Sequence, residues 1–152
     1  MEKQAGSILG KTLSIVILLA ILGSITALFY LVAFPQSKEK FTEFYILGIE
    51  EKATNYPRQL VVGQEGRVIV GIVNREHETV SYVLEVIIDG IMSNEVGPIT
   101  LEHGEKWERI VNFTPNRVGN NQKVGFLLYR QGQSEVYQEL YLWVNVIEAE
   151  VL

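Results

Sequence analysis

Two different patterns of apolar and polar residues divide the chain. The first is a run of 23 residues without a charge, 12–34, which begins after Lys11 and ends before Pro35. As a helix this run spans about 34 Å, enough to cross a hydrocarbon core about 30 Å thick. It lacks the polar stripe at helical period that a helix of a soluble core shows. The pattern predicts one transmembrane helix over residues 12–34, after a short cytoplasmic tail, 1–11, and before a polar linker, 35–40.

A cleaved secretory signal is the alternative explanation of this run. The apolar region of such a signal has about 7–15 residues and ends at a small-x-small cleavage site. Here the run is longer and ends in Val-Ala-Phe-Pro, so we expect an uncleaved anchor in the cell membrane, in contact with lipid through residues 12–34. Two lysines precede the run, Lys3 and Lys11, and two follow it, Lys38 and Lys40, so the positive-inside rule favours neither orientation. Because a short tail with few charges is easily left in the cytoplasm, we expect the N-terminus inside and the domain outside the cell.

Small residues in the predicted helix are four positions apart. Gly23 is spaced in this way from Ala27, and Ala20 from Ser24. This spacing lets two helix backbones approach closely in lipid. Small residues are also common in any anchor, so the four are candidates for helix packing.

One glycosylation sequon, Asn112-Phe113-Thr114, follows in the second part of the chain. A used sequon lies on the surface of an exported protein, so Asn112 is a candidate glycan acceptor and agrees with an extracellular domain. Such triplets also arise by chance, and Pro115 directly after this one hinders modification.

Beyond residue 40 the apolar residues recur with a period of two, which is typical of strands. Turn residues separate the strands about every 8–12 residues. Asp89-Gly90 is the strongest turn signal, because a type I′ turn needs positive φ at both central positions. Seven or eight short strands of this kind predict an all-β fold, an immunoglobulin-like antiparallel β-sandwich of residues 41–152. The expected strands are 41–47, one ending at 61–62, 67–74, 79–89, 98–101, 106–113, one around 124–128, and 136–147.

Composition and charge narrow the class of protein further. The chain has no Cys, which excludes a disulfide scaffold and a cysteine zinc site. Residues 41–152 carry nine Lys and Arg against sixteen Asp and Glu, a net charge of −7. An acidic domain of this kind is a poor nucleic-acid binder.

Few residues of the chain are candidates for catalysis or metal binding. The sequence has no nucleophile elbow, phosphate-binding loop or metalloprotease motif. His77 and His103 each lie beside glutamates in predicted turns, and two such turns bind a divalent metal if they meet. Solvated turns in an acidic protein show the same residues. We therefore expect no metal, no cofactor and no enzymatic activity.

The last predicted strand has two unlike faces. Its even positions from Leu140 to Val146 are apolar and suit the core, whereas the odd positions include Tyr137, Tyr141 and Trp143. If solvent reaches this face, the three aromatic side chains are candidates for a partner or glycan surface. The alternative is that neighbouring residues, Leu127 and Tyr129, cover them. A slip of one residue in register exchanges the two faces.

Several short motifs follow one another along residues 41–147: FTEFYILG at 41–48, YP at 56–57, VGQEG at 62–66, VGIVN at 70–74, GPITL at 97–101, GEKW at 104–107, FTP at 113–115, FLLY at 126–129 and LWV at 142–144. The series identifies residues 41–147 as similar to the extracytoplasmic domain of the Domain of Unknown Function 1616 family, found mainly in archaeal membrane proteins. The resemblance implies a membrane location and an archaeal source, and it supplies no catalytic residue. Many members have several membrane helices before this domain, whereas one is expected here.

These features together predict a non-catalytic, membrane-anchored β-sandwich with a binding or structural role at the cell envelope. Its partner is expected to be an envelope or membrane protein, or a glycan. The alternative is an accessory subunit of a membrane complex, such as glycan-processing or export machinery, held through its helix. A membrane-tethered hydrolase is disfavoured because few polar side chains are available for a catalytic cluster.

Overall fold

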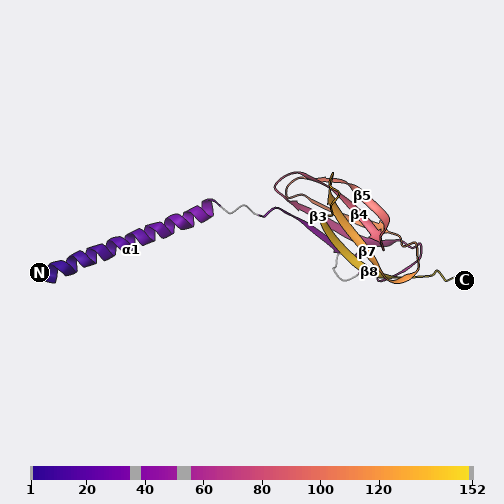
Figure 1. Cartoon of the computed structure of the whole chain (residues 1–152), viewed down its shortest axis with the longest axis horizontal. Coiled ribbons are helices and arrows are strands. Elements are labelled where there is room, and N and C mark those ends of the chain that lie inside the picture. Colours follow the sequence, from indigo (N-terminus) through magenta and orange to yellow (C-terminus); the bar gives the residue numbers. More distant parts are fainter. Residues whose placement is uncertain (1, 35–38, 51–55, 151–152) are drawn as a thin grey trace. The chain divides into compact units, whose positions relative to one another are not determined.

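The computed structural model describes residues 2–34, 39–50 and 56–150. The chain divides into two compact units, Met1–Glu39 and Lys40–Leu152, and we call the second the β unit. The first unit is helical and the second consists of strands (Figure 1).

The first unit contains one long helix, α1 (Glu2–Ala33). The helix begins ten residues before the charge-free run and ends one residue before Phe34. Its segment Gln4–Ala33 contains an 18-residue window with a mean hydropathy of 2.7 and is long and apolar enough to cross a membrane. Its large apolar side chains are exposed in the structure. Length and composition alone suit a membrane anchor or a signal sequence. Of the predicted linker, residues 35–38 lie outside the described residues.

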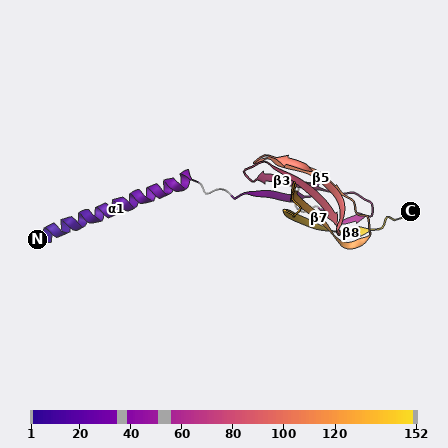
Figure 2. The same cartoon turned by 45° about the horizontal axis from the view of Figure 1, so that its top comes forward.

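The β unit has eight strands within its described residues, arranged in two sheets (Figures 1 and 2). The three-stranded sheet has the order β1-β3-β6 and the five-stranded sheet the order β2-β8-β7-β4-β5. A core lies between the sheets, which confirms the predicted β-sandwich. The strands are β1 (Phe41–Leu47), β2 (Gln59–Val61), β3 (Gly66–Arg75), β4 (Val80–Ile88), β5 (Ile91–Leu101), β6 (Lys106–Phe113), β7 (Gly119–Arg130) and β8 (Gln138–Ile147).

One pair of strands departs from the predicted antiparallel arrangement. β2 and β8 run parallel, with Leu60 opposite Val146. β1 belongs to the other sheet, so the chain crosses from one sheet to the other before β2. β2 then runs beside the end of β8 in the same direction as that strand. Leu60, which is buried, then closes this end of the core. The expectation of a purely antiparallel sandwich is therefore wrong for this pair.

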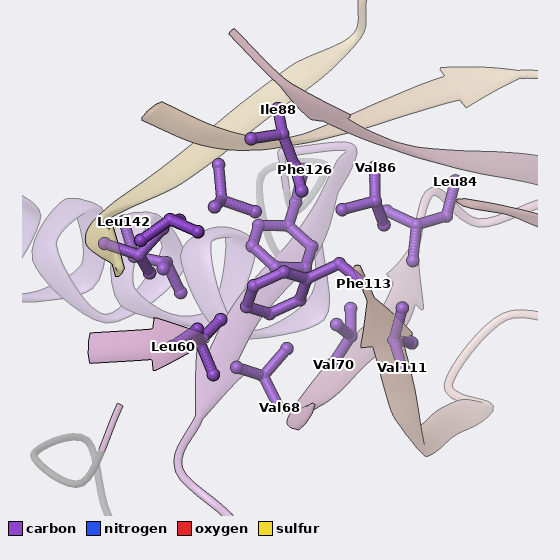
Figure 3. Close-up of a cluster of buried hydrophobic side chains, with 13 residues drawn as sticks. Leu60, Val68, Val70, Leu84, Val86, Ile88, Val111, Phe113, Phe126 and Leu142 are labelled. Atoms are coloured by element: carbon purple, nitrogen blue, oxygen red, sulfur yellow. The ribbon is translucent and has the colours of Figure 1, made fainter. Parts of the chain in front are cut away.

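The core is built from the alternating apolar positions that the sequence predicts. The inward residues of β3, β4 and β7 are fully or almost fully buried. Phe113 and Phe126 meet edge to face at the centre of the largest cluster, with ring centroids 6.1 Å apart (Figure 3). Asp89 and Gly90 both have positive φ, at 46° and 82°, which confirms the predicted β4–β5 turn.

β5 is longer than the sequence predicts. It extends over eleven residues, whereas only 98–101 were expected. Gly97 and Pro98 interrupt the apolar alternation, and the register with β4 shifts between Tyr82 and Leu84. β5 is an edge strand, so Pro98 removes no hydrogen bond from the interior of the sheet.

A glycine in β3 makes room for a tyrosine that crosses the three-stranded sheet. Gly71 lies opposite Tyr45 of β1 and Glu108 of β6. The Tyr45 hydroxyl donates a hydrogen bond to Glu108 Oε2. The same oxygen forms an ion pair of 2.8 Å with Lys106 Nζ. A Cβ at Gly71 would lie 2.0 Å from the Tyr45 ring. The absence of a side chain at Gly71 therefore permits this bridge across three strands.

We expect Gly71→Ala to lower the free energy of unfolding by about 1–2 kcal/mol, because the new methyl group displaces the Tyr45 ring. Urea denaturation followed by tryptophan fluorescence measures the change. In a Tyr45→Ala background the same substitution should cost much less, because the clash is gone. An equal cost in both backgrounds would contradict this explanation.

Candidate functional site

Two large aromatic side chains lie together on the outer face of the five-stranded sheet. Tyr141 and Trp143, both on β8, are 57% and 54% exposed. Their rings meet at 75°, with centroids 5.9 Å apart. The inward neighbours Leu142 and Val144 are buried, so the predicted alternation of β8 is confirmed here. The two rings form an exposed aromatic corner.

The adjacent strand β7 supplies a cation to this corner. Lys123, opposite Trp143, forms an ion pair of 2.7 Å with Glu139 and lies 4.8 Å from the centre of the Tyr141 ring. Gly125, opposite Tyr141, presents no side chain. A hollow of about 140 Å³ results, and Ile87 and Leu127 line it together with Gly125, Lys123 and Glu139. We call the outward residues of β7 and β8 the aromatic face: Lys123, Gly125, Leu127, Glu139, Tyr141 and Trp143.

Neighbouring residues leave the aromatic face open. Leu127 and Tyr129, which the sequence offered as a cover, are themselves half-buried on β7. Tyr141 and Trp143 remain more than half exposed beside them. Two of the three predicted aromatic candidates are therefore available to a partner.

The third candidate, Tyr137, lies elsewhere. It occupies a bend before β8, packs against the core and donates its hydroxyl hydrogen bond to Glu76 Oε1. The alternation of β8 begins only at Gln138. The predicted strand began at residue 136, which placed Tyr137 on the same face as Tyr141 and Trp143. That placement is wrong, and Tyr137 is not part of the aromatic face.

Tyr137 belongs to a buried polar cluster around one carboxylate. Glu76 is only 2% exposed. Its Oε1 accepts hydrogen bonds from Thr42 Oγ1 at 2.8 Å and from Tyr137, and forms an ion pair of 2.7 Å with Arg130. The Thr42 and Tyr82 hydroxyls are 2.7 Å apart. We call these five residues the Glu76 cluster. Contacts between residues far apart in the sequence build it, so no local motif could have revealed it.

Two opposing effects set the pKa of Glu76. Burial alone raises the pKa of the carboxyl group, because it disfavours the charged form. Hydrogen bonds from Tyr137, Thr42 and Arg130 stabilise the carboxylate and outweigh burial, so the pKa of Glu76 lies below its usual value. Burial likewise opposes the charge of Arg130, but its hydrogen bond to Glu76 prevails and raises the pKa of Arg130. Both groups are therefore charged at neutral pH.

The two histidine turns meet, as a metal site would require. The rings of His77 and His103 are stacked with centroids 4.4 Å apart. His103 Nδ1 accepts a hydrogen bond of 3.2 Å from the backbone N–H of His77. Within residues 2–34, 39–50 and 56–150, no group of three or more His, Cys, Asp or Glu side chains is placed to hold a metal ion. The two turns therefore contact each other through the histidine rings and one hydrogen bond.

The sequon lies on a strand. Asn112 of β6 is half-buried, and its carbonyl oxygen accepts a hydrogen bond of 2.8 Å from Asn94 Nδ2. Asn112 Oδ1 is buried and has no hydrogen-bond partner among the described residues. The backbone N–H of Thr114 donates to Ser93 Oγ at 2.9 Å. Glycosylation of Asn112 stays a prediction.

The small residues of α1 lie on the exposed surface of that helix. Ser24 Oγ donates a hydrogen bond of 2.8 Å to the carbonyl oxygen of Ala20, so its hydroxyl is satisfied within the helix. Gly23 has open space where a Cβ would be, and Ala27 is exposed one turn later. Helix packing through these four residues stays a prediction.

Comparison with known protein families identifies the β unit. The model of the Domain of unknown function (DUF1616) matches residues 35–145. The chain belongs to the DUF1616 family. The resemblance seen in the sequence motifs is thus confirmed. No curated protein matches this DUF1616 chain significantly.

Solved structures show which fold the DUF1616 domain shares. A crystal structure of a CARDB domain from Pyrococcus furiosus, determined in complex with di-metal ions, is 17% identical, with a TM-score of 0.51 over 71% of this chain and 89% of that chain. A solution NMR structure of a Pyrococcus furiosus CARDB domain is 15% identical, with a TM-score of 0.51 over 72% of this chain and 98% of that one. A β-glucosidase from Listeria innocua is 16% identical, with a TM-score of 0.48 over 75% of this chain and 17% of its own. The DUF1616 domain is thus a β-sandwich resembling a CARDB domain, and the likeness extends to the fold alone.

Proposed function

We propose that this DUF1616 protein is a membrane-anchored, non-catalytic binding module whose immunoglobulin-like β unit recognises a partner outside the cell. The partner is an envelope or membrane protein, or a glycan. The observation that carries the proposal is the exposed pair Tyr141 and Trp143 on the aromatic face. Large aromatic side chains supply much of the binding energy at protein interfaces.

The length of the apolar helix supports an anchor over a signal peptide. Its charge-free run, 12–34, has 23 residues, whereas the apolar region of a signal has about 7–15. In lipid its exposed apolar side chains meet hydrocarbon instead of water. The anchor keeps its short N-terminal part in the cytoplasm and holds the β unit outside.

The state of the charged groups supports a non-catalytic role. Glu76 is the most deeply buried carboxylate of the described β unit, and its Oε1 already accepts from three side chains. A carboxylate so occupied, with a lowered pKa, is a poor general base. Glu139 of the aromatic face is paired with Lys123.

A pull-down with matched variants tests the binding role of the aromatic face. The intact chain is recovered from detergent-solubilised membranes of its source, and bound proteins and sugars are measured by mass spectrometry and monosaccharide analysis. We expect the double variant Tyr141→Ala/Trp143→Ala to lower partner recovery at least about tenfold, as loss of a binding hot spot does. Ile110→Ala removes a 47% exposed side chain from the other sheet and should leave recovery unchanged. Equal recovery with all three proteins would overturn the proposal.

A second candidate function is that of an accessory subunit held in a membrane complex through α1. The open surface at Gly23 and the exposed Ala27 favour it, because small residues let helices approach closely in lipid. Exchange of α1 for an unrelated transmembrane helix separates the two candidates. Partner recovery survives the exchange if the β unit is the binding part and is lost if α1 is.

Protease treatment of intact cells tests the orientation. The β unit should be removed while the helix remains with the membrane. Full protection of the β unit in intact cells, with digestion after lysis, would place it in the cytoplasm instead.

A further inference from the structure

The edge strand β8 is only partly covered. In the five-stranded sheet β8 lies between β7 and the three-residue strand β2. β2 pairs with Asn145, Val146 and Ile147. The preceding part of β8, 138–144, pairs with β7 on one side, and no strand of the described residues lies beside it within the sheet on the other. We call these seven residues of β8 the free edge.

The backbone groups of this edge point outward in a regular pattern. Asn145 N–H donates to the Arg58 carbonyl at 2.8 Å, and the Ile147 carbonyl accepts from Val62 N–H at 2.9 Å. The odd residues of β8 thus direct their backbone groups toward β2, and the period of two extends this direction to residues 139, 141 and 143. For these three residues the described part of the chain provides no backbone partner on that side. Such a row of free donors and acceptors is a template for another strand.

An apolar hollow lies beside the free edge. It has a volume of about 450 Å³ and lies between β1, an edge strand of the other sheet, and β8. Near it, Gln138 Nε2 of β8 donates to the Thr42 carbonyl of β1 at 2.7 Å. Within its lining, the Tyr56 hydroxyl donates to the Ile46 carbonyl at 3.0 Å. Its apolar lining comes from Phe44, Ile46, Tyr56, Leu140 and Leu142.

From this arrangement we propose that an extended peptide segment of a partner protein adds as a strand to the free edge of β8 at residues 139–143. The inference rests on the proposed binding role and names the chemistry of the partner. Side chains of a strand alternate between its two faces. Every second side chain of the added strand enters the hollow and is apolar, and the others lie beside Tyr141 and Trp143.

The backbone edge favours a peptide over other ligands. Three alternate residues, 139, 141 and 143, each present a backbone donor and a backbone acceptor. The backbone of an extended peptide has donors and acceptors at the same spacing. The stretch also lacks the devices that protect natural edges, such as proline, a bulge or an inward charge. Its one charged residue, Glu139, points to the aromatic face and pairs with Lys123.

A second copy of this chain is a poorer occupant. Two β8 edges could pair with each other, but the inward side chains of each strand already fill their own core. The hollow beside Leu140 would then remain empty. A partner segment without a core of its own fills both the edge and the hollow.

Selection of peptides tests the proposal without knowledge of the partner. The full chain in phospholipid nanodiscs is offered a phage-displayed library of random octapeptides. Enriched peptides should show apolar residues at alternate positions, and synthetic copies of them serve as the probe. Absence of enrichment, or enriched peptides without this alternation, would overturn the proposal.

Two substitutions of Tyr141 distinguish binding through the backbone from binding through the side chain. Tyr141→Pro removes an N–H that points away from β7, so the ladder within the sheet is kept. It should weaken probe binding about tenfold or more, as the loss of a hydrogen bond in a shielded site does. Tyr141→Ala keeps the N–H and loses only the contacts of the ring, so it should weaken binding less than Tyr141→Pro does. Equal losses in the two variants would show that the ring, not the edge, binds the probe.

Hydrogen exchange gives a readout that needs no variant. In the wild-type chain the probe should slow amide exchange about tenfold or more at residues 139, 141 and 143. The amides of Leu140 and Leu142, which face β7, should change little. Unchanged exchange at the three odd positions would overturn the proposal even if Tyr141→Pro fails to fold. A concentration-dependent dimer that competes with the probe would also overturn it, in favour of self-pairing.

The binding role of the aromatic face and the addition of a strand to β8 can be refuted independently. If the pull-down depends on Tyr141 and Trp143 side chains but no peptide binds the edge, the binding role stands and the strand addition is wrong. If peptides bind the edge but the double alanine variant recovers every partner, the aromatic face is not the recognition surface.

Discussion

Glu76→Ala is expected to lower the free energy of unfolding by about 3–4 kcal/mol, because it leaves buried polar groups without their acceptor. Arg130 would lose its counter-charge, and the Tyr137 hydroxyl its acceptor in the Glu76 cluster. Denaturant unfolding of the full chain in detergent, followed by tryptophan fluorescence, measures the loss. The matched control is Glu78→Ala, two residues away. The Glu78 side chain is 57% exposed and 4.0 Å from Lys40, so its removal should cost less than about 0.5 kcal/mol.

The effect of Glu76 should depend on pH. The pKa of Glu76 is about 4.5 in the unfolded chain and lower in the folded protein, because hydrogen bonds outweigh burial. Its charge therefore stabilises the fold fully above pH 4.5, and this contribution is lost as the pH falls through the lower folded pKa. The stability difference between the wild type and Glu76→Gln should shrink over this acid range. A difference that stays constant from pH 7 to the acid range would contradict the lowered pKa.

Phe126→Ala is expected to cost about 3–5 kcal/mol, because it opens a cavity where the two sheets meet. Phe126 is fully buried and contacts the ring of Phe113 edge to face (Figure 3). The same denaturation experiment measures the loss. Phe41→Ala removes the same atoms from a side chain that is 46% exposed and should cost less than about 1 kcal/mol. Similar costs at the two positions would mean that the centre of the core lies elsewhere.

The alternation of apolar residues predicted most of the sandwich. Strands such as β4 have one fully buried face, so Tyr82, Leu84 and Val86 repeat at a period of two that the sequence displays. Short or interrupted strands lack this signal. β2 has three residues, and in β5 the pair Gly97-Pro98 breaks the pattern, so pairing with neighbouring strands defines both.

The candidate site was predictable only where it follows one strand. Tyr141 and Trp143 share a face because they are two residues apart within a regular strand. Tyr137 differs because a bend precedes β8. In the sequence Glu76 resembled a solvated turn residue. Its burial depends on β1, β7 and the segment before β8, which lie far from it along the chain. The free edge of β8 follows from strand order, which no local pattern encodes.

The place of Thr42 has a mechanical consequence. Thr42 lies two residues after the start of the β unit, so tension transmitted along the chain from α1 reaches β1 first. Its hydroxyl is bonded to Glu76 and its carbonyl to Gln138, the first residue of β8. A load between the helix and a ligand held on β8 thus passes through a short crosslink between the two strands. Such a load therefore reaches the hydrogen bonds of Thr42 before it can separate β1 from β3.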